Sequence, residues 1–103
     1  MIQIDVKKAE NGDIIGFHVC GHAGFSEIGT DVVCAGVSAL IINCINSVEK
    51  FSDTRFDLIQ KDGNMEFTCK PPLDDRAVVL LQSLFFGVQE IQKKYGNEYV
   101  TLQ

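Results

Sequence analysis

The sequence lacks the marks of several large classes of protein. No uninterrupted run of 18–20 apolar residues occurs, so a membrane-spanning helix is not predicted. The first eight residues alternate between apolar and polar side chains, without the basic start and apolar centre of a signal peptide. We therefore expect a cytoplasmic protein that has no contact with a membrane.

An excess of basic charge is also absent. The chain has 9 lysines and arginines against 14 aspartates and glutamates, a formal net charge of −5. Such a chain offers no obvious surface for nucleic-acid phosphates, so direct binding of nucleic acid is not expected. A basic protein or peptide would instead be attracted at long range.

Paired cysteine motifs are missing as well. The four cysteines lie at positions 20, 34, 44 and 69, and no C-x2-C pair occurs among them. Three of them lie inside apolar runs, and no secretory signal is evident, so free thiols are expected rather than disulfides. Cys20, Cys44 and Cys69 are expected in the core.

The patterns that are present predict one domain over residues 1–103. Alternating or apolar runs predict five strands, and two long segments have apolar residues at helical spacing. The strands are expected near 2–7, 13–21, 51–61, 64–70 and 98–102, and the helices from Thr30 or Asp31 to about 50 and from Asp74 or Asp75 to about 95. Asn11-Gly12 and Asp62-Gly63 predict tight hairpins, which join antiparallel strands.

The order of these elements, β-β-α-β-β-α-β, predicts an α+β fold. Two amphipathic helices suffice to cover one face of a sheet, so we expect a two-layer sandwich with a mostly antiparallel sheet. The first helix carries apolar residues on most of its sides and is expected to be covered on most sides. Phe86, beside Phe85 on the second helix, points to a second apolar face or to a residue under a loop.

A loop rich in glycine is expected between the second strand and the first helix, over residues 23–30. Gly24 and Gly29 are candidate hinges, and Phe25 and Ile28 are isolated apolar residues that can close over a ligand. The alternative is an ordinary connector, although eight residues exceed the usual length of a connection.

The two ends of this loop carry a histidine and a cysteine. If Asp31 caps the helix, Cys34 lies in the first turn, where unpaired amides and the helix dipole lower the pKa of a thiol. His22 is one loop away, and it can accept the proton of the thiol if the loop folds back. The same pattern also arises in proteins where cysteine is only a small core residue.

Further residues near this pair have two readings each. Ser38 lies four residues after Cys34 on the same helix face, where it either lines a site or bonds back to its own helix. Asp31 is expected to be a helix cap, and it can also orient His22. His18, Cys20 and His22 alternate along one strand and, with Cys34, have the donor types of a zinc site, although their spacing does not match a zinc knuckle.

The combined pattern resembles the Prp family of ribosomal-processing cysteine proteases. The motif runs Gly21-His22-Ala23-Gly24, then Gly29-x-Asp31-x-Val33-Cys34-Ala35-x-Val37-Ser38-Ala39. The resemblance covers nearly the whole chain, including the opening hairpin and the Tyr-Gly before the last strand. It implies an α+β fold with Cys34 as the nucleophile and His22 as the general base, and with less certain roles for Asp31 and Ser38.

The resemblance also implies a substrate and a mode of assembly. The family removes a short N-terminal extension from large-subunit ribosomal protein twenty-seven, so a basic ribosomal protein precursor is the expected substrate. It forms homodimers, needs no metal or cofactor, and orders the loop between its histidine and cysteine around the substrate. Amides near Gly21 and at the helix start would hold the oxyanion. The rival interpretations are a non-catalytic ribosome-associated binding module and a zinc or thiol protein.

Overall fold

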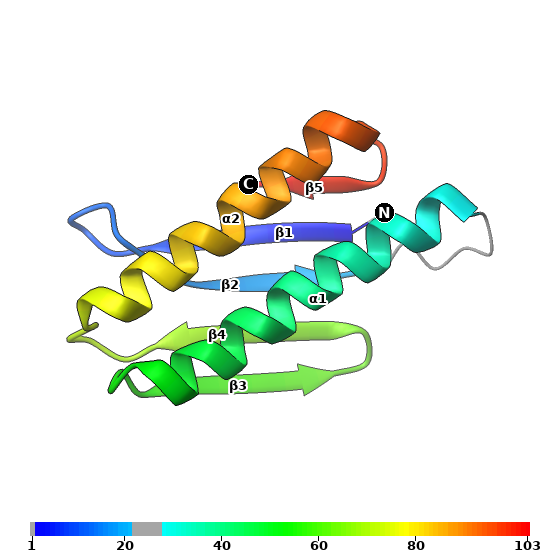
Figure 1. Ribbon diagram of the computed structural model, residues 1–103. Helices are drawn as coiled ribbons and strands as arrows, with labels where there is room; N and C mark the ends of the chain where they lie inside the picture. The colour runs from blue at the N-terminus through cyan, green and yellow to red at the C-terminus, as the bar shows by residue number, and fades with distance from the viewer. Residues whose placement is uncertain (1, 22–27) are drawn as a thin grey trace.

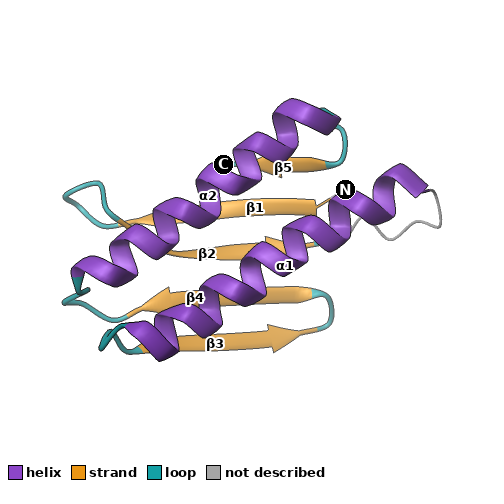
Figure 2. Ribbon diagram, in the orientation of Figure 1, coloured by secondary structure: helices purple, strands orange, loops and turns teal. Residues whose placement is uncertain are grey.

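The computed structural model describes residues 2–21 and 28–103 and shows two layers. Two helices lie side by side across one face of a sheet, and no helix formed by the described residues covers the other face (Figures 1 and 2). The elements are β1 (Ile2–Lys8), β2 (Ile14–Cys20), α1 (Ile28–Phe51), β3 (Phe56–Lys61), β4 (Asn64–Cys69), α2 (Asp75–Tyr95) and β5 (Val100–Leu102). The predicted α+β class and the predicted element order are confirmed.

The sheet has the order β3-β4-β2-β1-β5. Both hairpins, β1–β2 and β3–β4, are antiparallel, and β2 also pairs antiparallel with β4. β5 pairs in parallel with β1, because the chain returns to the sheet through α2. The prediction of a mostly antiparallel sheet is therefore correct.

The two hairpin turns differ in their backbone. Asp62 and Gly63 both have positive φ, 49° and 80°, as the Asp-Gly pair predicts for a tight two-residue turn. In the first hairpin Gly12 has a φ of 91°, but Asn11 is not among the positive-φ residues, and the loop is closed by a bond from the Ala9 amide to the Asp13 carbonyl. The predicted hairpin is confirmed, but its loop is longer than the two residues that Asn11-Gly12 indicated.

An irregularity in the pairing of β1 with β2 changes which residue meets the core. Lys7 pairs with Gly16, whereas Lys8 pairs with Ile14, so the register shifts by one residue there. A bulge of this kind interrupts the strict alternation of side chains. Ile14 consequently packs against the core, although strict alternation along β2 from Phe17 would place Ile15 there.

Aromatic rings form the centre of the core. Phe17 of β2 and Phe67 of β4 are fully buried and stack with ring centroids 5.3 Å apart. Phe85 of α2 meets Phe17 edge-on at 6.0 Å, and Phe56 of β3 lies 4.7 Å from Phe67. These contacts tie three strands to the helix layer and hold the sheet in place under α1 and α2.

Helix α1 differs from its prediction in three respects. It begins at Ile28 and ends at Phe51, so it includes residues that were assigned to a loop before it and to a strand after it. Gly29 has a low helix propensity, which favoured a loop in the prediction. The structural context of a long helix overrides the preference of a single residue. The helix is also open on one side, where Val32 and Ile42 are half-exposed, so the prediction that it is covered on most sides is wrong.

Helix α1 is also long and apolar enough to cross a membrane by length and composition alone, over the window from Val32 to Phe51. The core helix of a compact domain passes the same test. In the structure the most apolar stripe of this helix faces the sheet and α2, and six of its residues are buried there: Val33, Val37, Ile41, Cys44, Ile45 and Val48.

The ends of helix α2 follow the sequence closely. The Asp74 carboxylate accepts a bond from the Ala77 amide at 2.9 Å, and its other oxygen accepts one from the Asp53 amide at 2.7 Å. These bonds to amides hold the pKa of Asp74 below its usual value. Gly96 ends the helix with a φ of 98° and donates its amide to the Gln92 carbonyl.

Candidate active site

Cys34 lies on α1 with its side chain half-buried and packed against the core cluster. Because α1 begins at Ile28, Cys34 is the seventh residue of the helix and not a first-turn residue. Asp31 therefore lies inside the helix, so the prediction that it caps α1 is wrong. The helix starts one turn earlier than a capping aspartate indicated.

This shift changes which amides are free. The amides of the first three residues of an α-helix have no partner inside the helix, and in α1 these belong to residues 28–30. Side chains on a helix lean back toward its N-terminus, so the surface that Cys34 covers lies over the preceding turn. The free amides thus belong to the turn toward which the Cys34 side chain leans.

The other three cysteines have different surroundings. All four are free thiols, as predicted. Cys44 and Cys69 are buried; burial, with the nearby Cys69 as a smaller cause, raises the pKa of Cys44 to about 12, and burial raises the pKa of Cys69 to about 11. Cys20 is half-buried and pairs with Gln3 and Asn64 on the uncovered face of the sheet, so its assignment to the core is wrong.

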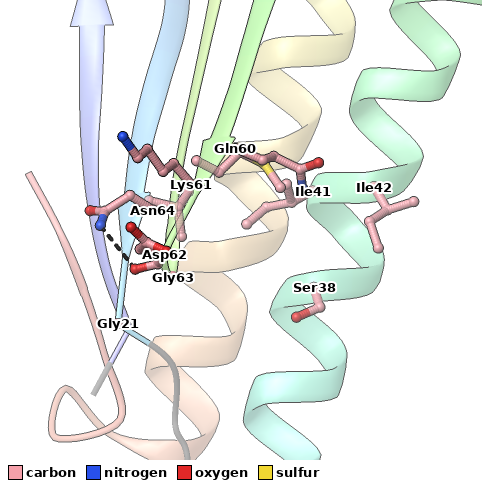
Figure 3. A pocket seen from close by; sticks show the side chains of 11 residues that line it. Gly21, Ser38, Ile41, Ile42, Gln60, Lys61, Asp62, Gly63 and Asn64 are labelled. Carbon is pink, nitrogen blue, oxygen red and sulfur yellow. Dashed lines mark hydrogen bonds between the residues drawn. The ribbon is translucent and has the colours of Figure 1, made fainter.

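A pocket of about 400 Å³ lies between α1 and the β3–β4 hairpin. Figure 3 shows Ser38 and Ile41 projecting from α1, and Gln60 extending from β3 toward the helix. Val19 and Met65 form the wall on the sheet, and Gly21 lies at the end of β2 beside them. The pocket therefore has an apolar floor and a polar rim.

Two of the supporting site residues that the sequence predicted line this pocket. Ser38 and Gly21 both line it, one from α1 and one from the end of β2. Cys34 lies one helical turn before Ser38, which places the two on the same side of α1. The end of β2 and the middle of α1 thus border the same cavity.

Other predicted residues are not placed there. His22, Gly24 and Phe25 lie outside the described residues. Ile28 and Gly29 belong to helix α1, so their assignment to a loop is wrong.

The contribution of the β3–β4 hairpin to the pocket was not predicted from the sequence. Residues 60–64, which include the Asp62-Gly63 turn, line the pocket opposite α1. A signal for this was present: Gln60 follows Phe56 and Leu58 at the alternate positions of β3 that face the helices, and a polar residue there marks a place that the helices do not cover.

The uncovered face of the sheet carries a polar network. The Lys7 ammonium donates to Glu66 at 2.6 Å and to Thr68 at 3.1 Å, and this bond to Lys7 lowers the pKa of Glu66. His18 lies 3.7 Å from the Asp5 carboxylate. Within residues 2–21 and 28–103, no group of three or more histidine, cysteine or acidic side chains is arranged to hold a metal ion. The zinc hypothesis also requires His22.

Comparisons with known proteins agree over the whole length of the chain. The family model for cysteine protease Prp matches residues 1–101. The ribosomal processing cysteine protease Prp of Staphylococcus aureus is 30% identical over 104 residues, which cover 99% of this chain and 97% of that protein. The protein of the same name from Bacillus subtilis is 29% identical over 103 residues, covering 94% and 92%.

Solved structures show the same similarity. A crystal structure of the essential ribosomal processing protease Prp from S. aureus, with a covalently linked product peptide, superposes with a TM-score of 0.89 at 30% identity and covers 100% of this chain and 98% of that chain. A second structure of the S. aureus protease, with a substrate peptide, has a TM-score of 0.89 at 28% identity and the same coverage.

Proposed function

The chain belongs to the Prp family of cysteine proteases, and from this premise we propose that it removes the short N-terminal extension of large-subunit ribosomal protein twenty-seven during ribosome assembly. The family assignment rests on a match to residues 1–101. The proposed substrate is supported by relatives that are ribosomal processing proteases and by a similar structure that holds a substrate peptide. The acidic balance of this chain suits a basic protein substrate.

The observation that carries the proposal is the position of Cys34. It is a half-buried free thiol on the side of α1 that borders a pocket, one turn before Ser38. Such a thiol can reach a peptide that occupies the pocket, whereas Cys44 and Cys69 are sealed in the core.

We propose a two-step acyl transfer with Cys34 as nucleophile and His22 as general base. His22 takes the proton of the Cys34 thiol, and the thiolate attacks the carbonyl carbon of the scissile peptide bond. The tetrahedral intermediate collapses, the C–N bond breaks, and His22 gives the proton to the leaving amine. Water, deprotonated by His22, then hydrolyses the thioester and releases the extension. These steps use no metal or cofactor.

The oxyanion of the tetrahedral intermediate needs hydrogen-bond donors. The free amides of residues 28–30 at the start of α1 are the first candidates, because the Cys34 side chain leans toward that turn. The backbone near Gly21 is the second, since Gly21 lines the same pocket and has a positive φ of 72°. Asp31 remains a candidate for orienting His22, and Ser38 a candidate for shaping the pocket. Contact of Gly24 and Phe25 with the substrate also stays a proposal.

We further propose that the chain acts in the cytoplasm as a homodimer. Support for a second copy comes from apolar side chains left exposed on the helix layer: Ile42 and Phe51 of α1, and Val79 and Phe86 of α2, are each more than half exposed. Phe86, at 64% exposure, does not lie under a loop in the described chain. Sedimentation equilibrium of the wild type and of Phe86→Asp measures this: the variant is expected to have a larger dimer dissociation constant and so to be monomeric at protein concentrations where the wild type is still a dimer.

The proposed activity is tested with ribosomal protein twenty-seven carrying its N-terminal extension. The precursor is incubated with the wild type, Cys34→Ala, His22→Ala and Cys20→Ala, and the product masses are measured. The wild type and Cys20→Ala are expected to remove the extension, and the other two variants to leave it intact. A non-catalytic binding module would leave the precursor uncut with every variant, and a zinc or thiol protein would contain metal or depend on Cys20.

A further inference from the structure

Gly87 lies in the middle of α2, and the side chain of Leu40 from α1 rests directly on its backbone. A Cβ atom at Gly87 would lie 2.9 Å from Leu40 Cδ1, 3.4 Å from Cδ2 and 3.7 Å from Cγ. Carbon atoms that are not bonded to each other normally keep about 3.5–4.0 Å apart. The two helices therefore approach each other so closely here that even a methyl group at position 87 would force Leu40 to move.

Leu40 has little freedom to turn aside. Its Cγ and both terminal methyls lie within 4 Å of the Cβ position at Gly87, so rotation about the last bond exchanges one branch for the other. Rotation nearer the backbone is restricted, because one of the three χ1 rotamers drives a helical side chain into the preceding turn. Leu40 also packs against the core cluster. A side chain at position 87 would consequently push α1 away from α2.

Helix α2 is the main support of α1 in the described chain. The backbone of α1 comes close to that of α2 at more places than to any strand, and the two helices lie side by side (Figure 1). Helix α2 is itself attached to the sheet, where Phe85 meets Phe17 edge-on. The Gln92 side chain also donates a hydrogen bond to the Val100 carbonyl of β5 at 3.0 Å. The position of α1 over the sheet therefore depends on how closely it packs against α2.

Cys34 and Leu40 belong to the same uninterrupted helix. Six residues separate their positions, which corresponds to about 9 Å along the axis of an α-helix. Ser38 and Ile41, which line the pocket, belong to the same stretch of α1. Because so short a stretch of helix moves as a rigid body, a displacement of α1 at Leu40 moves the Cys34 thiol by a similar amount. The separation between this thiol and the end of β2 changes with it.

We infer that Gly87 is a positioning residue for the reaction at Cys34: the lack of a side chain at position 87 lets Leu40 hold α1, and with it the thiol, in the place from which it attacks. This inference rests on the proposed protease activity. Ordinary contact between Leu40 and a Cβ atom at position 87 requires a shift of roughly 0.5–1 Å. A misplacement of about 1 Å lowers the rate of an oriented reaction by about a hundredfold. Stability alone would favour alanine at position 87, since glycine weakens the interior of a helix.

The first experiment compares cleavage of the precursor by Gly87→Ala and by a matched control, Gly36→Ala. Both changes replace a helical glycine by alanine, but a Cβ atom at Gly36 would only touch the end of the Ile91 side chain, at 3.4 Å. kcat is expected to fall roughly ten- to a hundredfold in Gly87→Ala and less than about twofold in Gly36→Ala. KM and Tm are expected to stay near the wild-type values in both, since the pocket lining is unchanged and alanine favours the helix. Equal kcat values for the two variants would refute the inference.

The second experiment shows whether Gly87 acts through Leu40. Leu40→Ala removes the atoms that a Cβ at position 87 would meet, so the further change Gly87→Ala is expected to alter kcat by less than about twofold in this background. A loss of kcat as large as in the wild-type background would show that Leu40 is not the link, and would overturn the inference.

The third experiment needs no cleavage. Labelling of Cys34 and Cys20 by iodoacetamide is followed in the wild type, Gly87→Ala and Gly36→Ala. Cys34 is expected to react roughly threefold or more slowly in Gly87→Ala alone, because the thiol has moved relative to its proposed base, His22. Cys20, on the uncovered face of the sheet, is expected to react at one rate in all three proteins. Equal Cys34 rates would overturn the inference whatever the enzyme cleaves, whereas absence of cleavage by the wild type would refute the proposed function itself.

Discussion

Replacing Gly16 by alanine should destabilise the protein strongly, because β2 and β4 approach each other closely there. A Cβ atom at Gly16 would lie 2.1 Å from the Phe67 carbonyl oxygen and 3.0 Å from the Thr68 Cα. Both are backbone atoms and cannot turn away as a side chain would. The two strands, normally about 4.8 Å apart, would have to separate by roughly 1 Å at their hydrogen-bonded seam.

The cost can be estimated from this displacement. Separation at Gly16 weakens the pairing of β2 with β4 and disturbs the stack of Phe17 on Phe67, the centre of the core. Overpacking of a well-packed site lowers the free energy of unfolding by about 1–3 kcal/mol. Because the clashing atoms here are backbone atoms that cannot move aside, we expect a loss of about 3 kcal/mol. In a domain of this size that corresponds to a Tm lower by roughly 12–24 °C.

The control is Gly36→Ala on helix α1. A Cβ atom there would lie 3.4 Å from Ile91 Cδ1, the end of a flexible side chain. Alanine is a better helix former than glycine by about 1 kcal/mol, so this variant should be as stable as the wild type or more so. Thermal and urea unfolding measure both. A Gly16→Ala protein within about 0.5 kcal/mol of the wild type, close to the ordinary range of surface substitutions, would refute the close approach of the two strands.

Other predictions concern the core and the helix cap. Phe17→Ala should cost about 3–5 kcal/mol in urea unfolding, whereas Phe86→Ala, at an exposed position, should change the stability of the monomer by less than about 0.5 kcal/mol. Thr54→Val should lower the free energy of unfolding by about 1–2 kcal/mol. The buried Thr54 hydroxyl accepts a hydrogen bond from the Asp74 amide, and its loss leaves that amide without a partner. The folded pKa of Asp74 is below its usual 3.8, so its stabilising effect is complete above that pH and is lost as the pH falls through the folded pKa. Tm measured between about pH 5 and pH 2 should therefore fall less steeply in Asp74→Asn than in the wild type. Parallel curves of Tm against pH for the two proteins would contradict a stabilising role of the Asp74 carboxylate as the cap of α2.

The sequence predicted the elements well where local chemistry decides them. Asp62-Gly63 dictates a tight turn, and Asp74 and Gly96 bound α2, because each acts through its own backbone or its nearest amides. The start of α1 was predicted wrongly since Gly29 reads as a loop residue, although the helix continues through it. Ile14 takes the core position that strict alternation would assign to Ile15, because a bulge, which no periodic pattern encodes, shifts the register.

The site was predictable only in part. The four-residue spacing of Cys34 and Ser38 predicted that the two share one side of a helix, and the structure places both on one side of α1. The pocket was not visible, because it depends on the angle at which α1 crosses the sheet. Only that angle shows that Gln60 and the hairpin residues 60–64 face Ser38 across a cavity.

The role of Cys34 as the nucleophile is tested by following alkylation and cleavage together. The wild type is treated with iodoacetamide at neutral pH, and at each time the label on every cysteine and the remaining activity on the ribosomal precursor are measured. Cys20 is an internal control, because its thiol is also half-buried. Cys34 is expected to react faster than Cys20, Cys44 and Cys69, and activity is expected to fall in proportion to the label on Cys34. Full cleavage activity in protein whose Cys34 is completely alkylated would contradict this role.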